Sequence, residues 1–420
     1  MQELPAQFDN DELFRRIASG KAFEWDIDLF YYTSAQLLNG FMGGFKSKKD
    51  IKLADFPQPS ITYGFNDPAM LTAFEMNMFH FSAAKTLEEI QQLNELYRKS
   101  KSFQDFYREA KKITDIANKG WMETEYNTAY QVGASSATYA RLMQQSELFP
   151  YWQYKTQEDD KVRPTHAALD DLLLPFNDPQ WNDIYPPNGW NCRCYVVPRL
   201  KSEAEDTDFG LERSKVNSYM QTPEWQSLKA QGWGVNRAKT GEVFTENQFY
   251  IRKFKNNAAS YLDKLTYEKW GLKSAEKMRE QASEAIKKYE GTAADWWKDQ
   301  KKLNDHISIL TDYAGRKIAL DKDTFDKHTT GKRKSRVSYL NALIQTIDNP
   351  DEVWINTGNK TKKYDQMVLL KYYKYETIVV IEGLGDDLGL TIDTWFPLAE
   401  QKKKIVNNYR RGLLIKNPEQ

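Results

Sequence analysis

Cysteine and histidine are scarce in this chain of 420 residues. The cysteines are Cys192 and Cys194, and the histidines are His80, His166, His306 and His328. Two cysteines in one CRC tripeptide cannot build a disulfide framework, and this usage fits a cytosolic origin. Any site that needs a histidine must draw on these four.

The chain also lacks an excess of either charge and any long apolar run. It has 59 Lys+Arg and 59 Asp+Glu, which excludes a basic chain that coats nucleic acid and an acidic disordered chain. No stretch reaches the roughly 18 apolar residues that a membrane helix needs. The first residues, MQELPAQFDNDELF, contain no basic region followed by an apolar run, so we expect no secretory signal.

Aromatic and charged residues are abundant. Aromatics make up 14% of the chain, with 12 Trp and 24 Tyr, and these side chains suit half-solvated contacts and interfaces. Charged residues make up 28%, so much of the chain lies on solvated surfaces. The length alone allows two to four domains.

The composition and the apolar periodicity along the sequence predict an α+β multidomain protein with four regions. Residues 1–145 read as helical, because apolar residues recur at three- and four-residue steps, for example between Leu87 and Ala117. Residues 146–205 form a small loop-rich module rich in Pro, Trp and Cys. Residues 206–305 are expected to be a helical spacer, with periodicity from Asn256 to Leu310. Residues 306–420 are expected to form an α+β domain with an antiparallel sheet.

Within the last region we expect one helix followed by a meander. Phe325–Ile347 reads as a helix with a basic first half. Runs rich in β-branched and aromatic residues predict strands over 353–357, 367–373, 377–383 and 388–396. NNYRRGLLI closes the chain with a further short strand, which gives a four- or five-stranded antiparallel sheet.

The CRC tripeptide is the first candidate site. Cys192 and Cys194, with His166 and an acid such as Asp159 or Asp160, could supply four zinc ligands. The C-x-C spacing is tighter than the usual C-x₂-C, and there is no second cysteine pair. We therefore favour reduced cysteines in a strand, with Arg193 paired to an acid, and keep a structural zinc ion as the alternative. In a strand the two Cα atoms would lie about 6.6 Å apart, near the limit for a disulfide.

The C-terminal region is the second candidate site, because basic and aromatic residues interleave there around one histidine. Backbone neutralisation and base stacking need this mixture. The residues expected to bind nucleic acid are Lys327, Arg333, Lys334, Arg336, Lys371, Tyr373 and Tyr409. For metal-free RNA cleavage His328 could act as acid or base, with Lys332, Arg410 or Arg411 as cation and Thr391 or Thr394 as a hydroxyl donor to phosphate. A solvated helix face is the simpler explanation for any single basic cluster.

The middle module resembles the phage Mu F-like head morphogenesis family. The shared text comprises Trp152, D-K-V-R from Asp160, His166 and Leu169-Asp170, followed by P-P-N-G-W-N-C-R-C from Pro186 to Cys194. The resemblance covers roughly residues 70–200. It implies a minor head protein that acts near the portal during capsid assembly.

The C-terminal region resembles the phage nuclease-like domains related to barnase, EndoU, colicin tRNases and RelE. The shared features are K-H at 327–328, N-P-D-E-V-W from Asn349, the strand text L-T-I-D-T-W-F that ends at Phe396 and the terminal Y-R-R-G-L-L. The resemblance spans about residues 312–416. It implies functional roles for His328, Thr394 and Arg411.

Together these observations predict a phage or prophage minor head protein with a metal-independent, RNase-like C-terminal domain that needs no cofactor. The expected partners are the portal, other capsid proteins and RNA such as tRNA, without a membrane. The expected locations are the virion head and the host cytoplasm. Two alternatives remain: a purely structural head protein whose C-terminal domain only binds, and a toxin nuclease.

Overall fold

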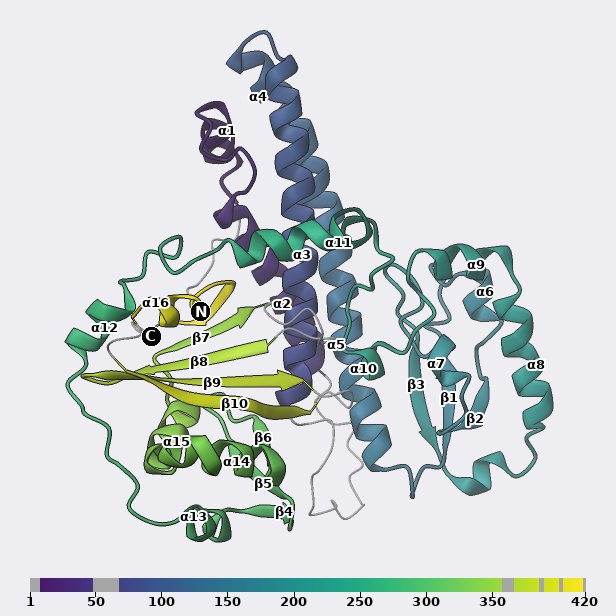
Figure 1. The fold of residues 1–420 in the computed structure, drawn as a ribbon. Coiled ribbons are helices and arrows are strands. Elements are labelled where there is room, and N and C mark those ends of the chain that lie inside the picture. The colour runs from purple at the N-terminus through teal and green to yellow at the C-terminus, as the bar shows by residue number, and fades with distance from the viewer. Residues whose placement is uncertain (1–7, 48–67, 357–365, 385–388, 400–402, 418–420) are drawn as a thin grey trace. The chain divides into compact units, whose positions relative to one another are not determined.

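The chain folds into two compact units. The first comprises Met1–Asn66 and Asn77–Ala258, and the second comprises Asp67–Met76 and Ala259–Gln420. This computed structural model describes residues 8–47, 68–356, 366–384, 389–399 and 403–417 (Figure 1). Helices dominate the N-terminal part and strands dominate the C-terminal part, which confirms the predicted α+β multidomain class.

The N-terminal region is helical, as predicted. Its elements are α1 (Asn10–Ala18), α2 (Ile27–Ser47), α3 (Pro68–Lys99), α4 (Phe103–Asp115), a π-helix (Ile116–Trp121) and α5 (Met122–Gln144). Helices α2 and α5 approach closely through glycine: a Cβ on Gly44 would lie 1.8 Å from the carbonyl oxygen of Tyr130. Only glycine allows this backbone contact.

The loop-rich module is built on a small antiparallel sheet of order β2-β1-β3. Its elements are β1 (Tyr151–Lys155), α6 (Pro164–Ala167), β2 (Leu173–Pro175), α7 (Trp181–Ile184) and β3 (Tyr195–Arg199). A short 3-10 helix (Lys201–Ala204), α8 (Phe209–Met220), α9 (Pro223–Ala230) and α10 (Arg237–Thr240) follow. Trp152, Tyr154 and Trp181 share one core cluster with both cysteines, so aromatic burial holds the module together.

The segment predicted as one helical spacer is divided between the two units. The boundary falls at Ala258, inside α11 (Phe249–Asp263). Farther along, α12 (Ala275–Gln281) and α13 (Ala293–Asp299) belong to the second unit. Ala275 packs in one core cluster with Trp354 and Val368, so this part of the segment contributes to the C-terminal core.

The second unit is organised around an eight-stranded sheet of order β11-β7-β8-β9-β10-β6-β5-β4. Its strands are β4 (Lys302–Asn304), β5 (Ile307–Thr311), β6 (Lys317–Asp321), β7 (Glu352–Asn356), β8 (Gln366–Tyr372), β9 (Glu376–Leu384), β10 (Leu390–Ala399) and β11 (Leu413–Lys416). The meander β7 to β10 and the closing strand β11 match the expectation. Strands β4 to β6 were not expected, and β4 and β5 replace the end of the predicted helical stretch.

Helices cover both faces of this sheet. Figure 1 shows α14 (Lys322–Thr329) and α15 (Leu340–Asp348) on one face and α12 and α16 (Lys403–Asn407) on the other. This explains why β7 is buried at every position, since a strand covered on both faces does not alternate. The predicted helix over 325–347 is wrong as one element. It breaks at Gly331, where φ is 54°, into α14, a 3-10 helix (Gly331–Tyr339) and α15.

Two ends of predicted strands, Thr357 and Leu388, lie outside the described residues. Among the helices that the structure describes, none combines the length and the apolar character needed to cross a bilayer.

Candidate active site and thiol–imidazole cluster

His328 lies in the last turn of α14, a helix whose start is fixed by a capping residue. Asp321 caps the N-terminus by accepting hydrogen bonds from the amides of Asp323 and Thr324. Phe325 is buried, and this places His328, three residues later, on the same inward face. A register shift in β10 between Ile392 and Thr394 leaves Asp393 as an extra residue, the kind of bulge that redirects neighbouring side chains.

The structure brings His328 and Thr394 together, as the sequence predicted. His328 Nε2 lies 3.2 Å from the hydroxyl oxygen of Thr394. Arg336, predicted only to bind nucleic acid, contacts the other ring nitrogen, Nδ1, and also donates to the carbonyl oxygen of Trp395 at 2.6 Å. A guanidinium can only donate, so Nδ1 is the acceptor and Nε2 carries the hydrogen that is donated to Thr394.

The surroundings of His328 are buried and cationic. Its side chain is 3% exposed. Burial and, to a smaller extent, the positive charges of Arg336, Arg333 and Lys327 together lower the pKa of His328 to about 4. The imidazole is therefore neutral at neutral pH, and the same three cations are available for an anion. Sequence reasoning missed the contact with Arg336 because the pair spans the helix break at Gly331.

Two of the predicted catalytic cations, Arg410 and Arg411, are not at this site. Arg410 is fully buried, and its guanidinium forms a two-pronged ion pair with Glu352 at 2.6 and 2.8 Å. Arg411 lies two residues before β11, and β7, β8 and β9 separate β11 from β10, so roughly 19 Å divides their positions in the sheet. The structure thus corrects the set His328–Arg410–Arg411. Lys332 is exposed in the 3-10 helix that also carries Arg333 and Arg336.

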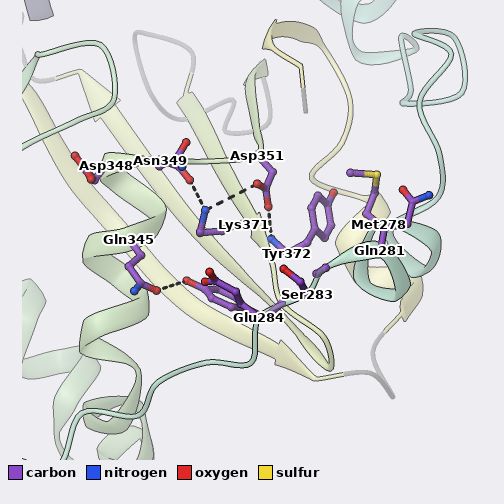
Figure 2. A pocket seen from close by; sticks show the side chains of 12 residues that line it. Met278, Gln281, Ser283, Glu284, Gln345, Asp348, Asn349, Asp351, Lys371 and Tyr372 are labelled. Atoms are coloured by element: carbon purple, nitrogen blue, oxygen red, sulfur yellow. Dashed lines mark hydrogen bonds and ion pairs between the residues drawn. The ribbon is translucent and has the colours of Figure 1, made fainter. Parts of the chain in front are cut away.

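Two residues predicted to bind nucleic acid lie instead in an acidic pocket of about 510 Å³. Figure 2 shows Lys371 between Asn349 and Asp351, and its ammonium donates to the Asn349 carbonyl at 2.6 Å. Tyr373 is buried and donates to Gln345 at 2.8 Å. Three carboxylates, those of Glu284, Asp348 and Asp351, line this pocket and disfavour phosphate, and binding of nucleic acid by Lys371 and Tyr373 stays a prediction.

The remaining predicted nucleic-acid contacts divide by exposure. Lys327 and Lys334 are exposed and Arg333 is half-buried, so all three can reach a ligand from solvent. Tyr409 is half-buried, and its ring packs 5.5 Å from the ring of Phe396. The available cations therefore gather on α14 and the following 3-10 helix.

The first unit holds a second cluster, made of His166, Cys192 and Cys194. His166 Nδ1 lies 3.7 Å from the sulfur of Cys192 and 3.6 Å from that of Cys194. All three side chains are buried, and their potential ligand atoms lie within 4.8 Å of one another. A hydrogen bond with Cys194, and then the contact with His166, lower the pKa of Cys192, whereas the bond with Cys192 and burial raise the pKa of Cys194.

Local sequence explains how the cluster forms. Pro164 opens α6 and places His166 in its only turn. The segment P-P-N-G-W-N then turns the chain back, with Asn191 in the left-handed region at φ 56°. A Cβ on Gly189 would lie 3.2 Å from the Arg163 guanidinium, which donates to the carbonyl oxygen of Trp190 at 2.8 Å. This turn delivers Cys192 and Cys194 to His166.

Two expectations about this cluster are corrected. The cysteines are not in a strand, because β3 begins only at Tyr195. Asp159 forms a two-pronged ion pair with Arg193 at 2.7 and 2.8 Å and does not contact the thiols. This is the pairing of Arg193 with an acid that we favoured over a metal site. Neither Asp159 nor Asp160 belongs to the group of ligand atoms around His166 among the described residues.

Comparison with known proteins places both clusters in matched segments. Residues 93–197 match the family model described as Phage Mu protein F like protein. Residues 295–416 match the model described as phage-Barnase-EndoU-ColicinE5/D-RelE like nuclease2. Both resemblances stated from the sequence are thereby confirmed for these segments.

Curated relatives match a part of the chain. Over 135 residues it is 36% identical to "Putative capsid assembly protein F" of Escherichia phage Mu, which is 32% of this chain and 28% of that protein. Over 103 residues it is 35% identical to "Mu-like prophage FluMu F protein" of Haemophilus influenzae, which is 24% of this chain and 23% of that protein. The chain thus spans about a quarter of the length of these relatives. No solved structure matches the chain at a significant level.

Proposed function

We propose, from the premise that one segment is Mu F-like and another is nuclease-like, that this chain is a phage or prophage head protein that acts in capsid assembly. We further propose that it acts at the portal vertex and carries a metal-independent endoribonuclease domain. The matched segments support the first part. The observation that carries the second part is the contact of His328 with Thr394 and Arg336 inside the nuclease-like segment.

The proposed chemistry uses the 2′-hydroxyl of RNA as the nucleophile. The 2′-oxygen attacks the adjacent phosphorus, its proton passes to Nδ1 of His328, and the bond to the 5′-oxygen breaks. The 5′-oxygen then takes a proton from the imidazolium, which leaves a 2′,3′-cyclic phosphate. A neutral imidazole is the form that can accept the first proton. Arg336, Arg333 and Lys327 would stabilise the charge that develops on the phosphoryl oxygens.

Arg336 has a double role in this proposal. In the structure it occupies Nδ1, the nitrogen that must accept the proton. A phosphate that binds the guanidinium would draw it from the ring and expose the Nδ1 lone pair. Partial neutralisation of the three cations by the phosphate would also raise the pKa of His328 from about 4 toward its ordinary value.

The test is incubation of the full-length chain with total tRNA in EDTA. Intact protein should leave 2′,3′-cyclic phosphate ends, while DNA of the same sequence should survive because it lacks the nucleophile. His328→Gln should lower the rate by about 10²–10⁴. His306→Gln is the matched control, since His306 is exposed in the same segment and should leave the rate unchanged. Equal cleavage by His328→Gln and intact protein would remove His328 from the proposal.

A second function, RNA binding without cleavage, is favoured by one observation. Both ring nitrogens of His328 are engaged and the ring is 3% exposed, which also suits a purely positioning residue. An RNA with 2′-deoxy linkages separates the two functions, because it reports binding alone. Binding of that RNA together with failure to cleave any RNA would favour the second function.

The proposed place in the head is tested separately. Particles produced by induction of a phage that carries this chain should contain it, and a tagged chain should be located at a single vertex by electron microscopy. Tags spread over all vertices would contradict the portal location and leave the capsid assignment intact.

A further inference from the structure

The distances in the thiol–imidazole cluster fit a tetrahedral metal ion. A zinc ion has Zn–N of about 2.05 Å and Zn–S of about 2.3 Å, so tetrahedral angles separate a nitrogen and a sulfur ligand by about 3.6 Å. The distances from His166 Nδ1 to the two sulfurs are 3.6 and 3.7 Å. Both nitrogen-to-sulfur distances thus match those between ligands of one zinc ion, and all three atoms lie within 4.8 Å of one another.

Both sulfurs converge on one ring nitrogen. Nδ1 of an imidazole has either one hydrogen or one lone pair in the ring plane, yet both sulfurs approach this same nitrogen. The two thiols also hydrogen-bond to each other, so the three groups form one compact donor set that a single ion could bind. Among the described residues, the buried hydroxyl of Tyr219 has no hydrogen-bond partner, and its ring stands 6.1 Å from the ring of His166. A buried polar atom without a partner indicates a missing water or ion nearby.

We propose that His166 Nδ1, Cys192 Sγ and Cys194 Sγ bind one zinc ion. Two thiolates and one imidazole form a soft donor set that selects Zn²⁺ over oxygen-preferring cations. The ligands come from α6 and from the turn that precedes β3, and the cysteines belong to the core cluster of Trp152 and Trp181. The ion would therefore join the turn to the rest of the module, and part of its binding free energy would stabilise the fold.

The three ligand residues line one side of a small pocket of about 20 Å³. That volume holds about one water molecule. Apart from the three ligands, its described lining contains Gln157, Lys161, Val162, Arg163, Asn191 and Arg193, with no carboxylate, imidazole or thiol. We assign the fourth position to solvent, and the cationic rim favours a small anion in exchange for it.

The direct test is the zinc content of the full-length chain, purified under reducing conditions without chelator. Intact protein should contain stoichiometric zinc. Cys192→Ser, Cys194→Ser and His166→Gln should each reduce it to background, while the matched control His306→Gln should retain it. Full zinc content in His166→Gln, or none in intact protein after growth in zinc-supplemented medium, would overturn the proposal.

A second measurement holds even where a ligand variant fails to fold. Native chain stripped of metal should bind one equivalent of Co²⁺ and develop a thiolate-to-cobalt charge-transfer band with strong visible bands, the signature of tetrahedral thiolate ligation. Cyanide should shift the visible bands if the fourth position is solvent. Binding of Co²⁺ without the charge-transfer band would contradict thiolate ligation, and visible bands insensitive to cyanide would contradict the open position.

Discussion

His166 and His328 are two buried histidines with opposite surroundings. His166 is 1% exposed and lies against two thiols, which become negative when they ionise. His328 is 3% exposed and lies against cations, with Arg336 on one ring nitrogen. The first environment attracts a cation, and the second repels one and favours an anion.

The sign of the neighbouring charge, rather than burial, therefore separates the two roles. Both histidines are held by short segments that bring remote residues together: a turn that follows cis-linked prolines in one case, and a broken helix beside a bulged strand in the other. Each role therefore depends on a few named neighbours, and each neighbour can be removed.

The largest expected effect tests which cations belong to the group around His328. Arg410 lies outside this group, because Glu352 matches its charge in the core. Arg410→Met leaves a buried carboxylate uncompensated and should destabilise the second unit by about 3–5 kcal/mol. Pulse proteolysis of the full chain in urea, with fragments from residues 259–420 quantified by mass spectrometry, measures this loss. The control Lys332→Met removes an exposed cation and should change stability by less than about 0.5 kcal/mol. Unchanged stability of Arg410→Met, with loss of RNA cleavage, would return Arg410 to the active site.

A smaller effect is expected from pH. The pKa of His328 is about 4 in the folded chain, against about 6.5 in the unfolded chain. Between these two pH values the unfolded chain binds one proton that the folded chain does not. The stability contributed by this group is complete above about pH 6.5 and is lost as the pH falls toward 4, by up to about 3 kcal/mol. Pulse proteolysis in urea across this range should show a steeper acid loss in intact protein than in His328→Gln. Parallel curves would mean that His328 is not held neutral by its surroundings.

The smallest effect distinguishes the cationic surface of α14 and the following 3-10 helix from the acidic pocket around Lys371. Lys327→Gln and Arg333→Gln should each weaken binding of 2′-deoxy-substituted RNA and lower the slope of log affinity against log salt by about 0.7, as expected for one lost phosphate contact on a single strand. Lys371→Gln is the matched control in the acidic pocket and should change neither quantity. Fluorescence anisotropy at several salt concentrations measures both. A salt slope reduced by Lys371→Gln alone would move the RNA to the pocket.

Sequence patterns predicted the parts of the fold that have strong local signals. The runs that became β7 to β10 are rich in β-branched and aromatic residues, so their strands were evident; β7 to β9 are largely buried on both faces, and β10 is buried in part. Strand β4 carries only Lys302, Leu303 and Asn304, all exposed, and a strand of that kind has no apolar period to detect. The break at Gly331 was missed because the residues around it keep a helical spacing of charge.

The candidate sites were predictable where residue types or shared motifs point to a chemistry. The resemblance to known families singled out His328 and Thr394, and ligand chemistry singled out His166 and the two cysteines. The ion pair of Arg410 with Glu352 was not predictable, because only the fold buries these two residues against each other. The negative charge of the pocket around Lys371 was not predictable either, because its carboxylates come from α15 and from the segments beside α12 and β7.

Side-chain ¹⁵N NMR of the native full-length chain reads the protonation and ligation state of both histidines directly. The sequence has 4 histidines, so His166→Gln and His328→Gln suffice to assign the relevant signals. His328 should appear as the neutral Nε2–H form at neutral pH and titrate near pH 4, with its pKa rising when a non-cleavable RNA is added. His166 should show Nδ1 bound to metal, with a signal that changes on chelation and not on addition of RNA. A His328 that titrates near 6.5 and ignores RNA, beside a His166 that ignores chelation, would contradict the account.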